Sequence, residues 1–502
     1  MFPTTQPSSI PTVQPTSQPT SRPTSLPSTQ PSSQPTTQPT GQPSSQPSSQ
    51  PSRQPSSQPS SQPSSIPTVL TAGLGELLTS PQYRARSSVG FAAFDPVTGK
   101  GYYWGSDSTS APLSALVNVT SIVASSNAFV ATTKQGRVVA WGSSYAIDGW
   151  TSFASSEQGG AYKGLQASEH AFAAIDGLWK VKSFGGDAYG GVVPDLVSQS
   201  LLNTAPLSLS STAGAFCAVD SAGKVFVWGN AYSGGAVNGV NNADLTGVEK
   251  VFANRGAFVG VRSDGKAFAW GSCAYGGCQT NLPRLAHVVA SSTAFVALTT
   301  DHEIISWGDA ELGGDSSLVS KQLSSGVVRY ISHTAGAFAG VKVDGSVVTW
   351  GSSSYGGDSS AVSGSLVGIV TVVASDRAFA AVTSKGKVVV WGDSKYGGSF
   401  SSAAQARSLS ANVTSVVATK AAFAALKKDG SVWAWGNSNY GGSIDDNIRT
   451  LLSNGTMLLQ GNDVAFLAIN SQGRVIGWGN KAVFNEAGVV GSIPITSANR
   501  VN

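Results

Sequence analysis

The sequence has little charge, little cysteine and no long apolar run, and each absence excludes a class of protein. Only 12% of the 502 residues are charged, and 31 Lys+Arg stand against 27 Asp+Glu. The basic residues do not form the clusters that bind nucleic acids or membrane surfaces. Three cysteines are too few for a disulfide framework or a Cys-rich zinc module. No stretch approaches the roughly 18–20 apolar residues that span a bilayer. We therefore expect no nucleic-acid partner and no membrane span.

Proline is abundant only at one end of the chain. Seventeen of the 24 prolines recur at every fourth position from Pro3 to Pro67, each opening a Ser/Thr-rich tetrapeptide. Proline fixes its own φ and favours extended neighbours, and nothing here could form a core. We predict a disordered, polyproline-II-rich stalk at 1–67 and a folded domain at 68–502. The composition favours a glycosylated extracellular spacer over a bare linker.

The domain repeats itself ten times. An Ala-Phe phrase is followed, usually twelve residues later, by an aromatic residue and Gly, and successive copies of this aromatic lie 37 to 44 residues apart. A period near 42 indicates a repeat architecture. The aromatic residues are Trp104, Trp141, Phe184, Trp228, Trp270, Trp307, Trp350, Trp391, Trp435 and Trp478.

Each copy reads as three short β-strands. In one copy, Thr371–Ser375 is a β-branched run, and two further apolar runs flank the turn Lys385-Gly386. A polar-Gly pair between two such runs is typical of a β-hairpin. One three-stranded unit cannot bury both its faces, whereas stacked units can. We predict an all-β protein, a β-propeller with three-stranded blades, and keep a β-solenoid as the alternative because ten exceeds the usual four to eight blades.

The phrase at 422–436, an apolar strand, Asp429-Gly430, an apolar strand and Trp435-Gly436, resembles the repeat of the regulator of chromosome condensation superfamily. The resemblance covers 83–480. It implies a propeller, usually with seven blades, so one ten-bladed ring and a seven-bladed ring with extra copies both remain open. The short period is closer to the branch typified by beta-lactamase inhibitor protein II, whose blades have three strands.

The two ends bear on closure and on completeness. The segment Pro494–Arg500 resembles the opening strand of another repeat, so it could complete the first blade, or the chain could stop within a repeat. The opening residues show neither the charged nor the apolar region of a secretory signal. We expect a fragment or an incomplete gene model as readily as a complete chain.

No enzymatic constellation emerges, and we expect no catalytic residue, metal site or cofactor. The four His residues occupy non-equivalent positions in the repeat, and adjacent strand residues such as Asp301 and His302 point to opposite faces. The hairpin Asp residues are turn formers first. The Gly-Gly pairs are not followed by the Lys-Ser/Thr and helix of a phosphate loop.

Three sets of residues remain as candidate sites. Cys273 and Cys278 could close a small disulfide loop, while Cys217 is expected in the core. The loops after the Trp-Gly pairs repeat Tyr-Gly-Gly, and their tyrosines could form a multivalent rim or simply anchor the loops. The sequons predict glycosylation if the protein is secreted. The rim tyrosines are Tyr189, Tyr232, Tyr275, Tyr355, Tyr396 and Tyr440, and the sequon residues are Asn118, Asn412 and Asn454.

Together these features predict a non-enzymatic binding or adhesion module outside the cell or in a cell wall, with a glycan or protein ligand. The stalk joined to these repeats resembles extracellular proteins of stramenopile algae. The alternatives are an intracellular regulator of a small GTPase, as in the chromosome-condensation branch, and a secreted enzyme inhibitor. The near-neutral domain, the stalk and the sequons favour the extracellular reading.

Overall fold

The structure is a computed structural model. It describes residues 84–492 except 95–97, 106–112, 150–161, 163, 202–203, 238–244, 454, 482 and 485–487. The chain divides into two units, Met1–Gln62 and Pro63–Asn502, and all the described residues belong to the second. The predicted stalk at 1–67 and the start of the predicted domain therefore lie outside the described residues.

Each repeat forms a separate antiparallel sheet whose strands follow the chain from inner to middle to outer. The first five sheets are β1 (Arg84–Ser87), β2 (Gly90–Phe94) and β3 (Gly101–Gly105); β4 (Val119–Ala124), β5 (Ala128–Thr133) and β6 (Val138–Gly142); β7 (Gly164–Ala167), β8 (Ala171–Ile175) and β9 (Val181–Gly185); β10 (Pro206–Ser211), β11 (Ala215–Asp220) and β12 (Val225–Gly229); β13 (Val248–Ala253), β14 (Ala257–Arg262) and β15 (Ala267–Gly271).

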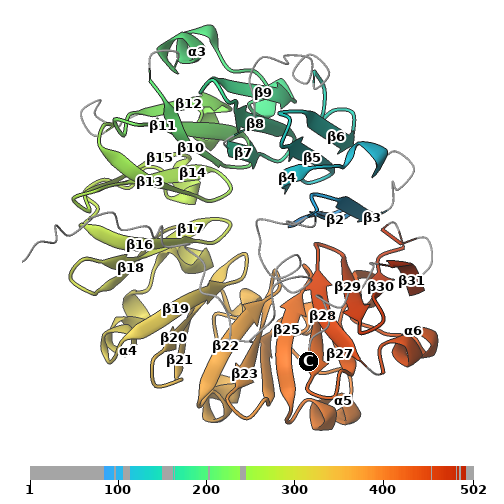
Figure 1. Ribbon diagram of the computed structural model, residues 1–502. Coiled ribbons are helices and arrows are strands. Elements are labelled where there is room, and N and C mark those ends of the chain that lie inside the picture. The colour runs from blue at the N-terminus through green and yellow to red at the C-terminus, as the bar shows by residue number, and fades with distance from the viewer. Residues whose placement is uncertain are drawn as a thin grey trace, which may run out of the picture. The chain divides into compact units, whose positions relative to one another are not determined.

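The second five sheets have the same order. They are β16 (Leu285–Ala290), β17 (Ala294–Thr299) and β18 (Ile304–Gly308); β19 (Val328–His333), β20 (Ala337–Lys342) and β21 (Val347–Gly351); β22 (Ile369–Ala374), β23 (Ala378–Thr383) and β24 (Val388–Gly392); β25 (Val413–Ala418), β26 (Ala422–Lys427) and β27 (Val432–Gly436); β28 (Thr456–Gly461), β29 (Ala465–Asn470), β30 (Arg474–Gly479) and β31 (Gly488–Ser492). Short helices connect some sheets on the outer side of the circle in Figure 1: α3 (Asp195–Leu201), α4 (Ser320–Ser324), α5 (Ala403–Ser408) and α6 (Asp446–Leu451).

The repeated Phe and Trp define how neighbouring sheets pack. In nine sheets the Phe of the middle strand pairs in register with the Trp of the outer strand, and in the third Phe172 pairs with Phe184. Phe379 pairs in this way with Trp391, and their rings stack with centroids 5.1 Å apart. This aromatic pair packs against the small residues of the preceding sheet's middle strand, here Ala337 and Ala339 of β20. Alternating large and small surfaces therefore bring the sheets close together and exclude water.

The same packing closes the ring. Ten hydrophobic clusters join each sheet to the next, and the last of them packs Ala465 and Leu467 of β29 against Phe91 and Trp104 of the first sheet. Figure 1 shows the ten sheets following one another around a circle. The fold is a β-propeller of ten blades, and the solenoid alternative is excluded because a solenoid leaves its first and last repeats apart.

The tenth sheet differs from the other nine by a fourth strand, β31, which pairs antiparallel with the outer strand β30. The first sheet already has three strands, because β1 pairs with β2. The place that the segment Pro494–Arg500 was expected to fill is thus occupied by β1. That segment itself lies outside the described residues.

Candidate ligand-binding face

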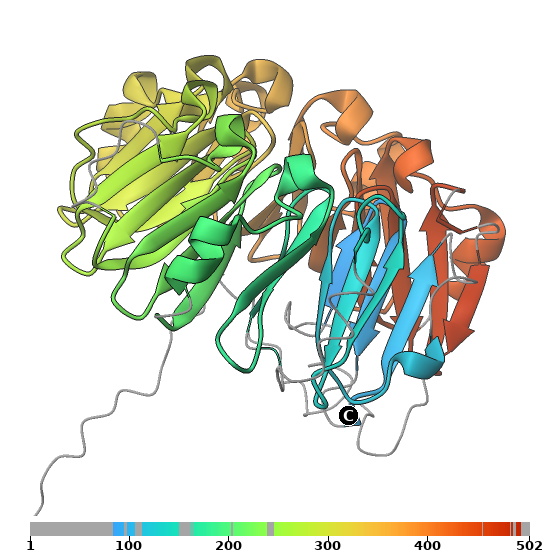
Figure 2. The same ribbon diagram turned by 90° about the horizontal axis from the view of Figure 1, so that it is seen from above.

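The topology gives the ring two distinct faces. Each inner strand turns into the middle strand at one face, and each middle strand turns through its hairpin into the outer strand at the opposite face. The outer strand then returns to the first face, where the Tyr-Gly-Gly loop follows it. Figure 2 shows the strands from a view turned by 90°. We call the face with the inner-to-middle turns the mouth face, and the opposite face, with the hairpins, the hairpin face.

A buried polar side chain fixes every inner-to-middle turn. In Ser168, for example, Oγ accepts a hydrogen bond from the Ala171 N–H at 3.1 Å and donates one to the Tyr189 carbonyl at 2.8 Å. The side chain thus satisfies a backbone donor and ties the turn to the following loop, which keeps the buried polar groups paired. All ten of these residues are buried: Ser87, Ser125, Ser168, Thr212, Asn254, Ser291, Thr334, Ser375, Thr419 and Asn462.

Nine of the ten residues that directly follow these line a depression on this face, and we call the ten together the mouth. Eight backbone N–H groups of the mouth donate to the carbonyl of the next mouth residue, in one run from Ser88 to Ser292 and another from Ala335 to Asp463. Neighbouring blades are therefore joined at the mouth by main-chain bonds. The mouth residues are Ser88, Ser126, Glu169, Ala213, Arg255, Ser292, Ala335, Asp376, Lys420 and Asp463.

Two adjoining depressions lie at the mouth. The larger, of about 410 Å³, is lined on one side by residues from Ser126 to His333 and on the other by Lys420. The smaller, of about 240 Å³, shares His333 and Lys420 and adds Asp376 and Asp463. Because Lys420 comes from the ninth sheet and lines the larger depression together with the second to seventh sheets, a single ligand there can contact both sides of the ring.

Charged side chains at the mouth form two pairs. The guanidinium of Arg255 lies 3.6 Å from the carboxylate of Glu169, and the ammonium of Lys420 lies 2.9 Å from that of Asp463. Partial burial opposes protonation of Lys420, but the hydrogen bond and charge of Asp463 raise its pKa overall. Partial burial raises the pKa of Asp376, and the negative charge of Asp463 adds to this effect.

His333 is the one titratable side chain at its repeat position among the residues whose side chains are described. This position, directly before the buried turn residue, holds Arg86 in the first repeat and Ala, Ser or Gly in the other eight. His333 instead lies exposed at both depressions. Its Nδ1 lies 3.1 Å from the Thr334 carbonyl and donates to it, and the surrounding protein lowers the pKa of His333 by desolvation.

Five of the six tyrosines proposed for a rim occupy equivalent places on the mouth face. Tyr189, Tyr275, Tyr355, Tyr396 and Tyr440 are half-buried and pack against the inter-blade clusters. Tyr232 does not belong to this set, because Ser233 takes the equivalent place, where its carbonyl accepts a hydrogen bond from the Thr212 hydroxyl. Tyr232 is one residue earlier and its side chain is 87% exposed.

Some of these tyrosines contact an arginine or histidine side chain from a neighbouring turn. The guanidinium of Arg377 lies 4.7 Å from the ring centroid of Tyr355 and 5.0 Å from that of Tyr396. The ring of His170 lies edge-on to that of Tyr189, with ring centroids 4.6 Å apart. Such contacts hold the loop tyrosines in place while leaving a polar edge towards solvent. The tyrosines thus both anchor loops and surround the mouth.

The glycine after each of these loop residues links one blade to the next. The Trp391 Nε1–H of one sheet donates to the Gly356 carbonyl of the preceding sheet at 3.0 Å, and six described repeats share this bond. Gly356 has φ +87°, and a Cβ there would lie 2.8 Å from the ring of Phe379. The repeated Gly therefore has a packing role, as the loop interpretation predicts.

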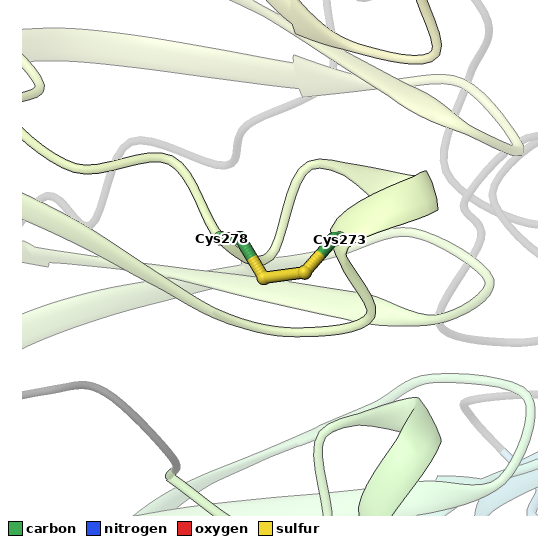
Figure 3. Close-up of a disulfide and its surroundings, with 2 residues drawn as sticks. All are labelled: Cys273 and Cys278. Carbon is green, nitrogen blue, oxygen red and sulfur yellow. A yellow bond between two sulfur atoms is a disulfide. The ribbon is translucent and has the colours of Figure 1, made fainter.

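The disulfide site is in one of these loops. Figure 3 shows Cys273 and Cys278 joined by a disulfide, with Cα atoms 4.6 Å apart. Within the described residues, Trp307, whose partner glycine would come from this loop, has an Nε1 without a hydrogen-bond acceptor. Cys217 is buried and free, as expected for a core residue, and burial raises the pKa of its thiol.

Two predicted glycosylation residues lie on the hairpin face. Asn118 and Asn412 have positive φ, and each precedes an inner-strand residue whose N–H donates to a hairpin glycine of the preceding sheet. Asn412 is exposed and Asn118 is half-buried. Asn454 lies outside the described residues. Sugars on Asn118 or Asn412 would therefore stand away from the mouth.

Within the described part of the chain, no three His, Cys, Asp or Glu side chains gather as a metal site would require. Likewise, no described helix has both the length and the apolar character needed to cross a bilayer. What the described residues do supply is a ring-shaped face of charged, aromatic and hydroxyl groups. This arrangement suits non-covalent binding.

Fold and face together define a class, the closed ten-bladed β-propeller with three-stranded blades, the last extended by a fourth strand, and a polar mouth. Comparison with known proteins adds one family and several similar structures. The PT disordered repeat family matches residues 26–69, within the proline-rich part. No curated protein matches the sequence.

Solved structures similar to this chain include the following three. The ectodomain of the receptor kinase CR4 from Physcomitrella patens is 16% identical, with 53% of this chain and 70% of that one covered and a TM-score of 0.31. The CRINKLY WD40 ectodomain of the Arabidopsis thaliana receptor kinase ACR4 is 14% identical, with 54% and 95% covered and a TM-score of 0.31. Prp20p from Saccharomyces cerevisiae, described as binding Gsp1p and histones, is 14% identical, with 57% and 73% covered and a TM-score of 0.29.

Proposed function

We propose that this protein is a non-enzymatic binding module that presents its mouth face to a glycan or protein ligand outside the cell, on a proline-rich stalk. One observation carries the proposal. The buried position of every inner-to-middle turn is Ser, Thr or Asn, whereas the next position, at the mouth, holds Ser, Ala, Glu, Asp, Arg or Lys. The repeat is uniform where it must fold and varied where it faces solvent, and ring closure gathers the varied positions in one place.

The hairpin face is more uniform in its backbone. Eight of its ten turns place a Gly with positive φ in second position, as at Asp264-Gly265 and Asp429-Gly430, and in the other two this position is held by Trp179 and His302, also with positive φ. The Asp side chains accept hydrogen bonds from their own turns, such as that from the Ser431 N–H to Asp429 at 3.0 Å. These backbone and side-chain hydrogen bonds lower the pKa of Asp429, as expected for a turn-forming carboxylate. We therefore assign the hairpin face a structural role and the mouth face the ligand.

Screening the full chain against arrays of glycans and secreted proteins tests this proposal. A ligand for which Asp376→Asn, Arg255→Gln or Lys420→Gln changes affinity, while Asp429→Asn on the hairpin face does not, supports it. A ligand that depends only on the hairpin face contradicts it. Nucleotide release from a small GTPase by the full chain would instead support the intracellular alternative.

The extracellular location needs a separate test. Expression of the full chain behind a secretion signal in a glycosylating host is expected to yield a product whose mass falls after removal of N-glycans. Asn412→Gln should lose one glycan, because Asn412 is an exposed sequon residue. A secreted protein whose mass does not change on this treatment would contradict glycosylation at the described sequons.

A further inference from the structure

The larger depression at the mouth has an excess of basic groups. Its lining includes Arg255, His333 and Lys420 but only one acidic side chain, Glu169. The whole chain carries a formal charge of only +4 spread over 502 residues, so this local excess is not a reflection of composition. A concave surface on which one sign of charge predominates favours ligands of the opposite sign.

The ion pairs at the mouth leave these cations available. Arg255 and Glu169 side chains are 60% and 32% exposed, and the Lys420 and Asp463 side chains are 48% and 38% exposed. Exposed pairs of this kind contribute little to stability, so a ligand anion can replace one partner. The contact of Arg255 involves one guanidinium nitrogen at 3.6 Å, and a guanidinium has five N–H donors.

The main chain of the mouth favours a sugar over a peptide. Peptides that bind by extending a sheet need unpaired backbone N–H and C=O groups. At the mouth, eight N–H groups already donate to the carbonyl of the next blade. Recognition must therefore come from side chains, which here are charged heads and the hydroxyls of Ser126 and Ser292. Such groups suit a ligand that has both hydroxyls and a charge.

We infer that the larger depression binds an acidic oligosaccharide, whose carboxylate or sulfate groups contact Arg255 and Lys420 on opposite sides of the mouth. This inference rests on the proposed function and names its ligand class. Because the two cations come from the fifth and ninth sheets, only the closed ring forms the site. Neither half of the domain would hold it alone.

Isothermal titration of the full chain with hexagalacturonate and with a sulfated hexasaccharide tests the inference and distinguishes the two acid groups. We expect one or both to bind, and the double variant R255A/K420A to bind at least about tenfold more weakly. The control K134A/K385A removes the same charge from two exposed lysines of the hairpin turns and should change affinity less than about twofold. Unfolding midpoints establish that both variants fold, and the single substitutions R255Q and K420Q replace the double variant if it does not.

Three results would overturn the inference. They are equal losses in both double variants, absence of binding by both acidic sugars, and binding of hexaglutamate as tight as that of the sugars. Failure of the inference is separable from failure of the proposed function. If a neutral glycan or a protein still depends on mouth residues, only the ligand class is wrong, whereas a ligand indifferent to every mouth residue contradicts both.

Discussion

The side-chain amide of Asn462 donates a hydrogen bond to the carbonyl of Gly90 at 3.4 Å, although the two residues are 372 positions apart. Asn462 also accepts from the N–H groups of Val464 and Ala465, at 2.9 and 2.7 Å. One buried side chain thus caps the turn of the tenth sheet and contacts the first sheet. The buried turn residue that caps the turn in every repeat therefore also joins the last sheet to the first.

Replacing this residue tests closure. Asn462→Ala leaves two buried N–H groups without an acceptor, and we expect it to lower the free energy of unfolding by about 1–3 kcal/mol. Asn462→Ser is the matched control, because Ser is the cap of other repeats and restores the acceptor without reaching Gly90. Denaturant unfolding of the full chain measures both. An alanine variant as stable as the wild type would contradict the role of Asn462.

The bonds between neighbouring blades give a second prediction. Trp391→Phe removes the buried bond from Nε1 to the Gly356 carbonyl and should cost about 1–3 kcal/mol. Trp307→Phe removes a ring of the same burial whose Nε1 has no acceptor among the described residues, so it should cost less. Equal losses in denaturant unfolding would show that the bond to Gly356 contributes nothing beyond packing.

The cysteines give a third prediction. A disulfide closing five residues is expected to stabilise by about 2 kcal/mol from chain entropy, so Cys273→Ser/Cys278→Ser should lower stability by that order. Thiol titration checks the assignment, since the native protein should show no reactive thiol and the denatured protein one, the buried Cys217. Reduction and denaturation together should expose three. Two or more reactive thiols in the native protein would contradict the disulfide.

The pKa of His333 predicts how stability varies with pH. Because this pKa is lowered from 6.5 in the folded state, the unfolded chain binds the proton more readily. The stability associated with neutral His333 is present above pH 6.5 and is lost as the pH falls below it. His333→Asn should therefore lose less stability than the wild type between pH 7 and pH 5. Parallel pH profiles of the two proteins in thermal unfolding would contradict this assignment.

Much of the fold could be predicted from the sequence, because its signals are local and repeated. The Asp-Gly turns, the Phe and Trp spaced by twelve residues and the apolar runs each specify a strand or hairpin, and ten copies leave little ambiguity. Closure could not be predicted, since the contact of Asn462 with Gly90 has no local signature. The sequence left ten-bladed and seven-bladed rings open for the same reason.

The candidate site was predicted less well than the fold. Five of the six rim tyrosines occupy equivalent places on one face, whereas Tyr232 does not, because the loop there reads Tyr-Ser-Gly-Gly and the serine takes the tyrosine's place. The mouth was missed because its residues differ from copy to copy, which looks like ordinary loop variation. The signal that could have found it is the Ser, Thr or Asn three residues before the Ala of the Ala-Phe phrase. The residue directly after this Ser, Thr or Asn is the mouth residue.

Hydrogen–deuterium exchange of the full chain with and without the acidic hexasaccharide tests the central claim most directly, namely that the mouth face binds the ligand. The account predicts slower exchange in the turns that carry Arg255 and Lys420, on two blades far apart in the sequence, and unchanged exchange in the hairpin turns at Asp264-Gly265 and Lys385-Gly386. Slower exchange confined to those hairpin turns, with the mouth unchanged, would contradict it.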